Sequence, residues 1–305
     1  MKLRDSLKQS AVNRHKMKKL LGFIPFSILK LSRGKLSKSL FTFQHERKNR
    51  KLINRENSIA AKNTNNQLER ISNLKKEFGN IAVAPYAGSI NRHEISIMPG
   101  ELVDFFCKYY TRPGMVYIDP FMGQGVRLQV AKLCGLDYYG YDVSNEFYQY
   151  ITRIKNRIDN GKTKINTTLG DSRYPNNIPD NIGDFSFHSP PYWNIEYYGD
   201  ETEQLGNGTY NEFLDGMYLI YKNWLPKFKS GAYNVININD FRRNKRFYAY
   251  HVDLINIAIK AGWILHDIWI IDGLIGGLPK AFAVDFNIKK IAPKIHEYAI
   301  VLRKP

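Results

Sequence analysis

From about residue 81 onward, short apolar runs alternate with longer amphipathic stretches. Short apolar runs bounded by turn residues are typical of buried strands, whereas apolar positions spaced three and four apart are typical of helices. The first pattern predicts strands over residues 116–118, 138–141, a stretch that ends at Gly170, 185–187, 232–238, 264–271 and 296–302, and the second predicts helices over 99–110, 126–134, 146–160, 210–228 and 248–261. Elements that alternate in this way build a mostly parallel sheet through right-handed crossovers. The sequence therefore predicts an α/β fold with helices flanking the sheet.

Residues 1–80 have a different pattern, in which polar and charged positions dominate. An apolar stretch over residues 20–29 is expected to dock on the rest of the chain, and residues 55–78 form a polar helix candidate with a weak apolar stripe. This pattern does not indicate a second core. The sequence predicts a basic N-terminal extension over residues 1–80 and one α/β domain over residues 81–305.

The net charge of +17 is concentrated in that extension. Residues 1–80 hold 20 of the 45 Lys and Arg but only 5 of the 28 Asp and Glu, so residues 81–305 are nearly neutral. Such a basic segment indicates a polyanion as partner, because phosphates that it neutralises release condensed counterions. A tail that serves only solubility is the alternative.

Composition argues against several other classes. Hydrophobic residues make up 43% of the chain, yet no apolar run approaches the roughly eighteen residues that a membrane-spanning helix needs. The basic N-terminus lacks the apolar core of a secretory signal, so a cytoplasmic location is expected. The two cysteines, Cys107 and Cys134, fit a reducing compartment. The seven histidines show no ligand spacing, so no metal site is expected.

The turn Ser189-Pro190-Pro191-Tyr192 follows the predicted strand 185–187 and is followed by Trp193. Two consecutive prolines end the strand and form a rigid turn at its carboxyl end. Open α/β sheets bind their ligands at the carboxyl ends of the strands. The turn combines a hydroxyl, carbonyl oxygens and aromatic faces, a set that suits a flat base with an exocyclic amine. A purely structural proline turn at the sheet edge is the alternative for these residues alone.

A second motif, Asp119-Pro120-Phe121-Met122-Gly123-Gln124-Gly125, lies between a predicted strand and a predicted helix. Glycines here let the backbone turn tightly and approach a ligand, and the helix N-terminus that follows offers free N–H groups. Asp142 ends the next strand, a placement suited to ribose hydroxyls, although it also suits a helix cap. Asp171 and Ser172 end a third strand-like stretch.

These motifs resemble those of the DNA amino-methyltransferases, whose catalytic motif is (Asp/Asn/Ser)-Pro-Pro-Tyr and whose S-adenosylmethionine loop is Asp-Pro-Phe-x-Gly-x-Gly. The resemblance covers roughly residues 90–240 and implies a Rossmann-like methyltransferase fold. It implies that S-adenosylmethionine is the cofactor, with an adenine contact near residues 170–172 and a looser match at residues 96–99 near the methionine moiety. The cofactor-binding residues that it implies are Asp119, Pro120, Phe121, Gly123, Gly125, Asp142, Asp171 and Ser172.

Residues 25–29, 238–243 and 296–299 are similar to a phage-borne branch of the same family, and no long insertion suggests a separate target-recognition domain. Specificity is therefore expected from the basic extension, from residues 196–209 or from residues 240–247. Nucleic-acid contacts are expected from Trp193, Arg242, Arg243, Lys245 and Arg246.

For catalysis we expect Tyr192 to stack on a base flipped out of the duplex, because aromatic stacking contributes roughly 1–3 kcal/mol per base. Ser189 Oγ and the Pro190 carbonyl would accept hydrogen bonds from the amine, with Pro191 completing the motif. A covalent route through Cys107 or Cys134 is not expected, since both fall within predicted helices.

The leading Ser189 favours N4-methylcytosine as the product, and N6-methyladenine is the first alternative. RNA methylation and a catalytically inert nucleic-acid-binding protein stay open as well.

Overall fold

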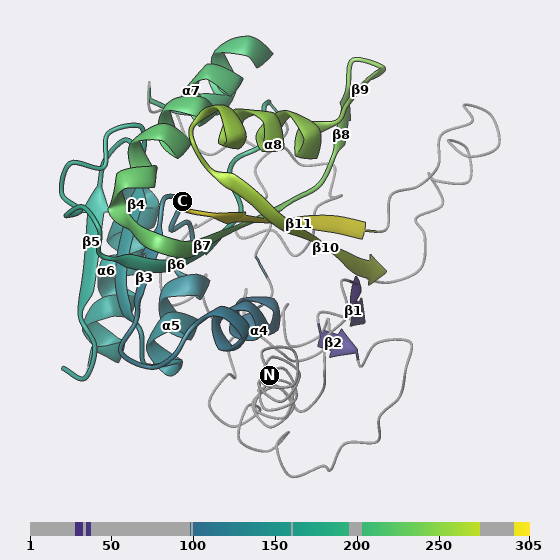
Figure 1. The fold of residues 1–305 in the computed structure, drawn as a ribbon. Coiled ribbons are helices and arrows are strands. Elements are labelled where there is room, and N and C mark those ends of the chain that lie inside the picture. Colours follow the sequence, from purple (N-terminus) through teal and green to yellow (C-terminus); the bar gives the residue numbers. More distant parts are fainter. Residues whose placement is uncertain are drawn as a thin grey trace, which may run out of the picture.

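The computed structural model describes residues 28–32, 35–37, 98, 100–159, 161–194, 203–274 and 296–305. The predicted helix over residues 55–78, residues 25–27 and 96–97, and the first half of the loop 196–209, residues 196–202, lie outside the described residues. The α/β prediction is confirmed, because strands and helices alternate along the described domain (Figure 1). The helices are α4 (Gly100–Tyr110), α5 (Val126–Leu133), α6 (Asn145–Ile158), α7 (Tyr210–Trp224) and α8 (Tyr250–Lys260).

One sheet of nine strands organises the described fold, in the order β2-β1-β10-β11-β7-β6-β3-β4-β5. Its strands are β1 (Ile28–Ser32), β2 (Lys35–Ser37), β3 (Val116–Asp119), β4 (Asp137–Asp142), β5 (Ile165–Leu169), β6 (Gly183–His188), β7 (Phe228–Ile238), β10 (Ile264–Leu274) and β11 (His296–Arg303). The five strands β3 to β7 are mutually parallel, whereas β11 runs antiparallel to β7 and to β10. The sheet is therefore mostly parallel and Rossmann-like.

Strand β3 marks the point where the strand order reverses. The chain runs outward from β3 to β4 and β5 and then returns to place β6 on the other side of β3. Ligands of open α/β sheets bind at such a switch point, outside the carboxyl ends of the strands. The loop that follows Asp119 and the turn that follows His188 leave the sheet at this point.

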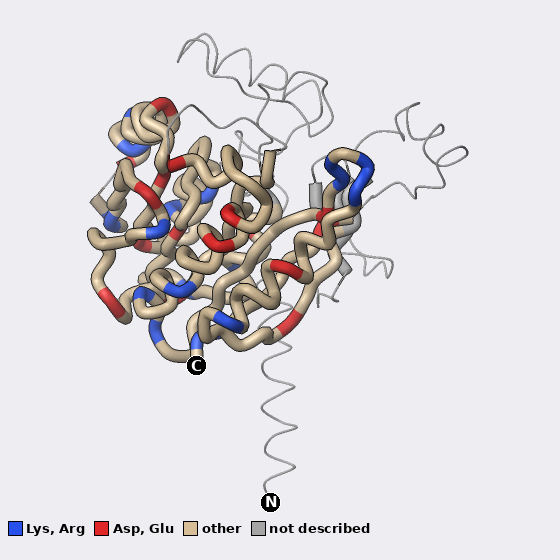
Figure 2. The backbone as a smooth tube through the Cα atoms, turned by 90° about the horizontal axis from the view of Figure 1, so that it is seen from above, with Lys and Arg blue, Asp and Glu red and all other residues tan. Residues whose placement is uncertain are grey.

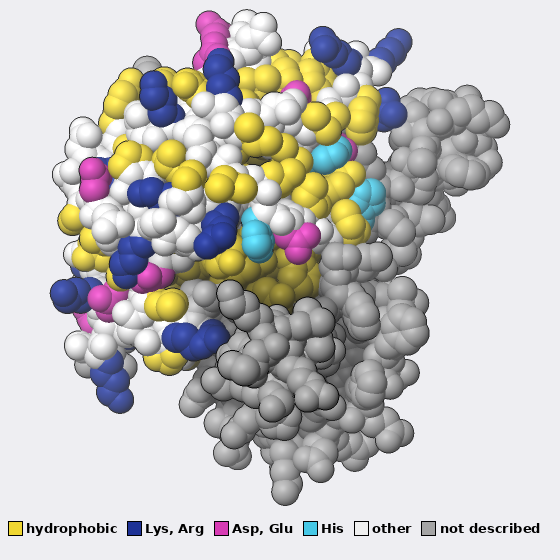
Figure 3. Space-filling view, viewed as in Figure 1, with side chains coloured by type: hydrophobic (Ala, Val, Ile, Leu, Met, Phe, Trp, Pro, Cys, Tyr) yellow, Lys and Arg dark blue, Asp and Glu magenta, His cyan; other side chains and the backbone are white. Residues whose placement is uncertain are grey.

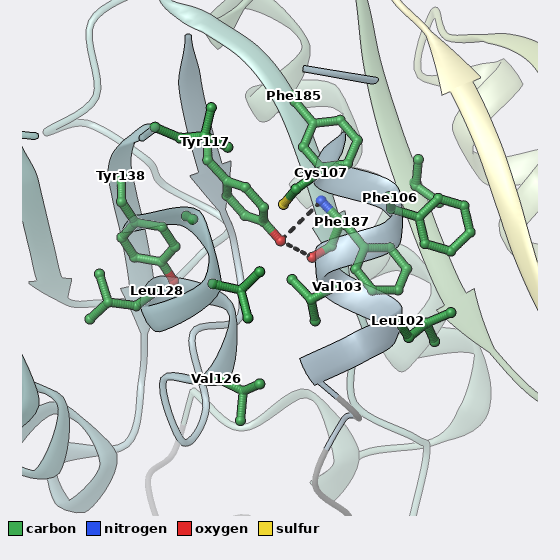
Figure 4. Close-up of a cluster of buried hydrophobic side chains, with 14 of the residues drawn as sticks. Leu102, Val103, Phe106, Cys107, Tyr117, Val126, Leu128, Tyr138, Phe185 and Phe187 are labelled. Carbon is green, nitrogen blue, oxygen red and sulfur yellow. Dashed lines mark hydrogen bonds between the residues drawn. The ribbon is translucent and has the colours of Figure 1, made fainter. Parts of the chain in front are cut away.

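Strands β3 and β6 are joined by one backbone pair and by one tyrosine side chain. Only Tyr117 and Phe185 pair directly between them. Two residues farther along β6, the backbone of Phe187 turns to the side chain of Tyr117 instead, donating its N–H to the hydroxyl at 3.3 Å and accepting the hydroxyl proton on its carbonyl (Figure 4). A buried tyrosine thus satisfies the N–H and carbonyl of Phe187 on β6.

Helices cover both faces of the sheet. Helices α4, α5 and α6 bury one apolar core against it, with the side chains of Phe106 and Cys107 beside those of Tyr117 and Phe187 (Figure 4). Helices α7 and α8 bury a second core on the opposite face (Figure 1). Strand β1 pairs in parallel with β10, so part of the predicted N-terminal extension joins this sheet.

The structure differs from the sequence prediction at the end of α7 and in one additional hairpin. The helix predicted to reach residue 228 ends at Trp224, because Pro226 stands in a short 3₁₀ turn and β7 begins at Phe228. A small hairpin of β8 (Phe241–Arg243) and β9 (Arg246–Tyr248) was not predicted. Its turn residues Asn244 and Lys245 both have positive φ, a geometry usually signalled by glycine, which is missing from the turn.

Candidate active site

A cavity of about 340 Å³ opens at the carboxyl ends of the parallel strands. Residues that follow β3, β4 and β5 line it together with the turn that follows β6. Its size and its mixed apolar and polar lining are those of small-molecule sites. The fold thus brings two motifs that lie about sixty residues apart in the sequence, the glycine-rich loop and the Ser-Pro-Pro-Tyr turn, into one cavity.

The glycine-rich loop takes the shape that its glycines allow. Gly123 lines the cavity with a φ of 51°, and its backbone N–H donates to Asp142 Oδ2 at 2.7 Å. Gly125 has a φ of 72° and is the N-cap of α5. A Cβ on Gly125 would lie 3.3 Å from Ile151, so this glycine also permits close packing of α5 on α6.

Asp119 lies beneath this loop and is completely buried. One carboxylate oxygen accepts hydrogen bonds from Arg127 Nε at 2.7 Å and from the Tyr138 hydroxyl at 2.8 Å, and the other accepts the Phe121 N–H at 3.0 Å. The Arg127 guanidinium also donates to the Phe121 carbonyl. The structure therefore places Asp119 as the anchor of the loop, whereas Pro120 and Phe121 line the cavity.

Asp142 lines the cavity at the end of β4. Burial raises the pKa of its carboxyl to about 6, against the opposing effect of the Ser144 and Gly123 N–H groups. The Ser144 N–H donates to Asp142 Oδ1 at 3.0 Å. Asp142 therefore shapes the loops on both sides of it. It lines the cavity, where the expected contact to ribose hydroxyls stays a prediction, but the N-cap of α6 is Ser144, so the expectation of a helix cap is wrong.

Asp171 and Ser172 line the cavity after β5. The Asp171 carboxylate pairs with Arg173 at 2.6 Å. The Ser172 hydroxyl donates to the Pro120 carbonyl, and the Ser172 carbonyl accepts the Trp224 indole N–H at 2.7 Å. These bonds tie the third strand end to the glycine-rich loop and to α7.

The groups on this side of the cavity fit S-adenosylmethionine. Gln124 is buried, and its Nε2 has no hydrogen-bond partner among the described residues. Such a donor suits the carboxylate of an amino acid, and the Asp142 carboxylate suits sugar hydroxyls. Met98 and Phe147 add apolar lining for the rest of such a molecule, which agrees with the loose match at residues 96–99.

Ser189, Pro190, Pro191 and Tyr192 all line the same cavity. The Tyr192 hydroxyl accepts the Asn239 N–H at 2.7 Å, and the Pro191 carbonyl accepts the Tyr250 hydroxyl at 3.0 Å. Tyr250 and Phe241 hold the Tyr192 ring through tilted and edge contacts. Ser189 Oγ and the Pro190 carbonyl have no hydrogen-bond partner among the described residues, so both acceptors are available to a ligand.

His188 directly precedes this turn but belongs to the core. It is completely buried, and its ring contacts those of Phe121 and Tyr221. Burial, together with the nearby charge of Arg127, lowers the pKa of His188 to about 3, so the imidazole is neutral at physiological pH. Cys107 is buried as well, and burial raises the pKa of its thiol, which disfavours the thiolate that a covalent route needs.

The residues expected to contact nucleic acid gather beside the cavity. The Trp193 indole donates to the Gly208 carbonyl at 2.8 Å and packs on Tyr210 and Tyr248. Arg242, Lys245 and Arg246 are exposed on the β8–β9 hairpin, which projects from the domain with Lys and Arg at its turn (Figure 2, Figure 3). Arg243 is partly buried at the same turn and donates to Asn194 Oδ1 at 3.3 Å.

Aromatic rings support the guanidinium groups of this hairpin. Arg242 lies 5.0 Å from the ring centre of Phe247, and Arg246 lies 5.1 Å from that of Tyr248. At the hairpin's base, Phe241 stacks on Tyr248. Since Phe241 also contacts Tyr192, the basic hairpin is built directly on the Ser-Pro-Pro-Tyr turn.

Sequence reasoning missed the cavity residues Asn237, Asn239 and Glu297, which come from the ends of β7 and β11. In the sequence, residues 238–243 and 296–299 stand out only as similar to a phage-borne branch. Polar residues at the end of an otherwise apolar strand, as in Asn237-Ile238-Asn239, are the signal that could have found them.

Two features are missing from the described part of the chain. No described helix is long and apolar enough to cross a membrane. No group of three or more His, Cys, Asp or Glu side chains among the described residues is arranged to hold a metal ion.

Many solved structures share this fold, since 941 chains match it. The [4+2]-cyclase SpnF is 14% identical over 81% of this chain and 98% of its own, with a TM-score of 0.50. Its name is that of a cyclase, so the shared fold alone does not identify a reaction. No curated protein sequence matches the chain significantly.

A protein from Thermus thermophilus, named "Putative DNA Modification Methylase", is 20% identical over 45% of this chain, with a TM-score of 0.34. The match spans about half of that protein, 51% of its length. The DNA methylase family model matches residues 13–153, a segment that includes the glycine-rich loop and Asp142 and ends before Ser189. The resemblance drawn from the motifs is thereby confirmed for residues 13–153, which match the model of the N6/N4 DNA methylase family.

Proposed function

We propose that the protein transfers a methyl group from S-adenosylmethionine to the exocyclic amine of a flipped DNA base, with cytosine N4 favoured. The observation that carries this proposal is the shared cavity, which the glycine-rich loop, Asp142 and the Ser-Pro-Pro-Tyr turn all line. A cofactor site and a base site must adjoin for direct transfer between two bound molecules. The family match supports DNA as the substrate.

On the cofactor side, the Asp142 carboxylate accepts hydrogen bonds from ribose hydroxyls, and Gln124 donates to the amino-acid end. Gly123 keeps the loop backbone close to the ligand without a side chain in the way. Asp119 does not line the cavity, and it acts as a positioning residue that fixes the loop through Arg127 and the Phe121 N–H. When bound, S-adenosylmethionine supplies the electrophilic methyl group.

On the base side, Tyr192 offers its ring as a stacking surface that replaces part of the stacking lost when a base leaves the duplex. Its hydroxyl is fixed by the Asn239 N–H and its ring by Phe241 and Tyr250, so the surface is formed in advance. Ser189 Oγ and the Pro190 carbonyl accept hydrogen bonds from the amine. The rate advantage then comes mainly from positioning the amine, because its lone pair is otherwise delocalised into the ring.

Outside the cavity, the β8–β9 hairpin supplies cations where DNA has to lie for its flipped base to enter. Arg242 and Arg246 are held over aromatic rings, which limits the side-chain freedom that phosphate contacts would have to restrict. The basic extension adds contacts that depend on phosphate and not on sequence. The leading Ser189 is the reason for favouring cytosine N4 over adenine N6.

The test is transfer of a labelled methyl group from S-adenosylmethionine to duplex DNA, single-stranded DNA and RNA by the full chain. We expect label in DNA, and a large loss of that label with Ser189→Ala. The matched control is Ser230→Ala, which removes an exposed hydroxyl at the other end of β7 that bonds the Pro305 carbonyl. Label found in RNA alone, or equal labelling by the wild type and Ser189→Ala, would overturn the proposal.

A further inference from the structure

Strands β6 and β7 bring Ser189 and Asn237 to the same level of the cavity. The two strands pair in parallel up to His188 and Ile236, so the residue that follows each of these lies beside the other. Neighbouring strands lie about 4.8 Å apart, and successive side chains alternate between the two faces of the sheet. Ser189 and Asn237 both line the cavity, so their side chains share the face that opens to it.

A hydrogen bond to β11 fixes the orientation of the Asn237 amide. Asn237 Nδ2 donates to Glu297 Oε2 at 2.8 Å. Because an ionised carboxylate only accepts hydrogen bonds, the amide must point its NH₂ at Glu297 and its carbonyl oxygen elsewhere. Asn237 is only 6% exposed, and its Oδ1 atom is buried without a partner among the described residues. A buried acceptor of this kind indicates that a donor is supplied to it when the site is at work.

The Ser189 hydroxyl has the complementary need. A hydroxyl oxygen has two lone pairs and one proton, and the proposed reaction uses only a lone pair, which accepts an N–H of the target amine. If the O–H is free to rotate, it can donate to the nitrogen of that amine. Such a bond would occupy the lone pair that has to attack the methyl group. An acceptor that engages the Ser189 proton would remove this competing hydrogen bond.

Asn237 is placed to be that acceptor. Ser189 Oγ moves among staggered positions by rotation about one bond, and the side chains of two residues at one level of adjacent strands can approach within the roughly 2.7–2.8 Å of an O–H···O hydrogen bond. The target amine itself needs no further acceptor, because its two N–H groups are directed at Ser189 Oγ and the Pro190 carbonyl. Asn237 therefore serves the serine and not the base.

We propose that Asn237 Oδ1 accepts the hydroxyl proton of Ser189 when a base occupies the cavity, and that Glu297 holds the Asn237 amide in the orientation that this bond needs. Ser189 then presents only lone pairs to the amine. Asn237 and Glu297 are positioning residues, since they act through Ser189 and not on the reacting atoms. The inference rests on the proposed function, because that function directs Ser189 Oγ at the amine.

The test is a double-mutant cycle on the single-turnover rate of methyl transfer to duplex DNA, with the full chain saturated with S-adenosylmethionine. Asn237→Leu removes the acceptor at similar volume, and it should lower the rate about tenfold in the wild-type background. In the Ser189→Ala background the same change should alter the residual rate by less than about twofold, since no hydroxyl proton is left to accept. Asn234→Leu is the matched control, because Asn234 is a buried asparagine of β7 that does not line the cavity, and it should leave the rate unchanged.

A second pair of variants tests the orientation of the amide. Glu297→Gln should lower the rate, because a glutamine can accept or donate and so lets the Asn237 amide turn its NH₂ toward Ser189. Asn237→Asp/Glu297→Gln reverses the bond between the two residues. The glutamine donates to the new carboxylate, which keeps an oxygen for the Ser189 proton. This double variant should recover most of the rate lost in Glu297→Gln, an outcome that a merely structural role would not produce.

Failure of this inference differs from failure of the proposed function. Equal losses from Asn237→Leu in the two backgrounds would overturn the inference alone, as would an Asn237→Asp/Glu297→Gln variant no faster than Glu297→Gln. If Asn237→Leu does not fold, this second comparison decides. An S-adenosylmethionine dissociation constant about tenfold higher in Asn237→Leu, measured by calorimetry, would assign the amide to the cofactor and overturn the inference as well. A wild type that binds S-adenosylmethionine but transfers no methyl group to an amine would overturn the proposed function and the inference together.

Discussion

The Tyr192 hydroxyl accepts a hydrogen bond of 2.7 Å from the backbone N–H of Asn239. This bond joins the turn after β6 to the end of β7, two segments about fifty residues apart in the sequence. It fixes the tyrosine ring from its far end, while Phe241 and Tyr250 hold its edge and face. The stacking surface is therefore preorganised before a base enters.

Two substitutions at Tyr192 separate this bond from the ring. Tyr192→Phe keeps the stacking surface and loses one hydrogen bond, worth about 0.5–1.5 kcal/mol, so its effect on the methyl-transfer rate should be modest. Tyr192→Ala also loses stacking worth roughly 1–3 kcal/mol, and its loss should be larger on matched duplex than on duplex with a mismatched target base. Single-turnover rates measure both. Equal losses from Tyr192→Ala on the two duplexes would remove the base-flipping role.

Affinity for S-adenosylmethionine should depend on pH through Asp142. Its carboxyl has a pKa of about 6, and only the ionised form accepts two hydroxyl hydrogen bonds. Affinity should therefore rise as pH rises through about 6 and then level off. Calorimetry on wild type and on Asp142→Asn measures this, and the variant should bind weakly and without that rise. A wild-type affinity that is flat across this range would contradict the assignment.

Ionisation of the buried Asp142 carboxyl destabilises the folded state. The folded-state pKa of about 6 lies above the ordinary value of 3.8, so the folded state resists ionisation of Asp142. Its contribution to stability is full below pH 3.8 and is lost as pH rises through 6. A binding carboxylate that opposes folding at neutral pH is typical of functional sites.

His188 should make the protein sensitive to acid in the opposite sense. Its folded-state pKa of about 3 lies below the ordinary 6.5, so its contribution to stability is present above pH 6.5 and is lost as pH falls toward 3. The loss approaches about 1.4 kcal/mol per pH unit within that interval. Denaturant unfolding of wild type and His188→Leu at several pH values isolates this group from Asp142. If the free energy of unfolding of wild type and of His188→Leu changed with pH in the same way, the role assigned to His188 would be contradicted.

The basic hairpin should govern how DNA affinity responds to salt. The double variant Arg242→Gln/Arg246→Gln should weaken binding of any duplex sequence to a similar degree and flatten the salt dependence, by about 0.9 in the log–log slope for each phosphate that is no longer neutralised. Lys164→Gln, at the exposed start of β5 on the far edge of the sheet, is the matched control. An unchanged slope in the hairpin variant would show that the hairpin does not contact phosphates.

Local sequence signals predicted much of the fold and of the cofactor side of the site. Glycines, prolines and strand ends mark the loop after Asp119 and the turn after His188, and open α/β sheets bring such positions together. The burial of Asp119 could not be predicted in the same way, because it depends on Arg127, whose side chain turns back from α5 beneath the loop.

The hydrogen-bonded pair Asn237 and Glu297 was not predicted from the sequence for a different reason. The two residues lie sixty positions apart, and they meet because β11 inserts antiparallel between β7 and β10. No local pattern encodes that insertion. The hairpin escaped because Asn244 and Lys245 adopt positive φ in a turn without glycine.

The most direct test of the central claim is the chemical identity of the methylated nucleoside. Duplex DNA is incubated with the full chain and with S-adenosylmethionine that carries a deuterated methyl group. The DNA is then digested to nucleosides, which are identified by mass spectrometry. The account predicts deuterated methyl on an exocyclic amine, as N4-methylcytosine, and its disappearance with Ser189→Ala. A deuterated methyl group on ring carbon C5 of cytosine, or no methylated nucleoside from a folded protein that binds S-adenosylmethionine, would contradict it.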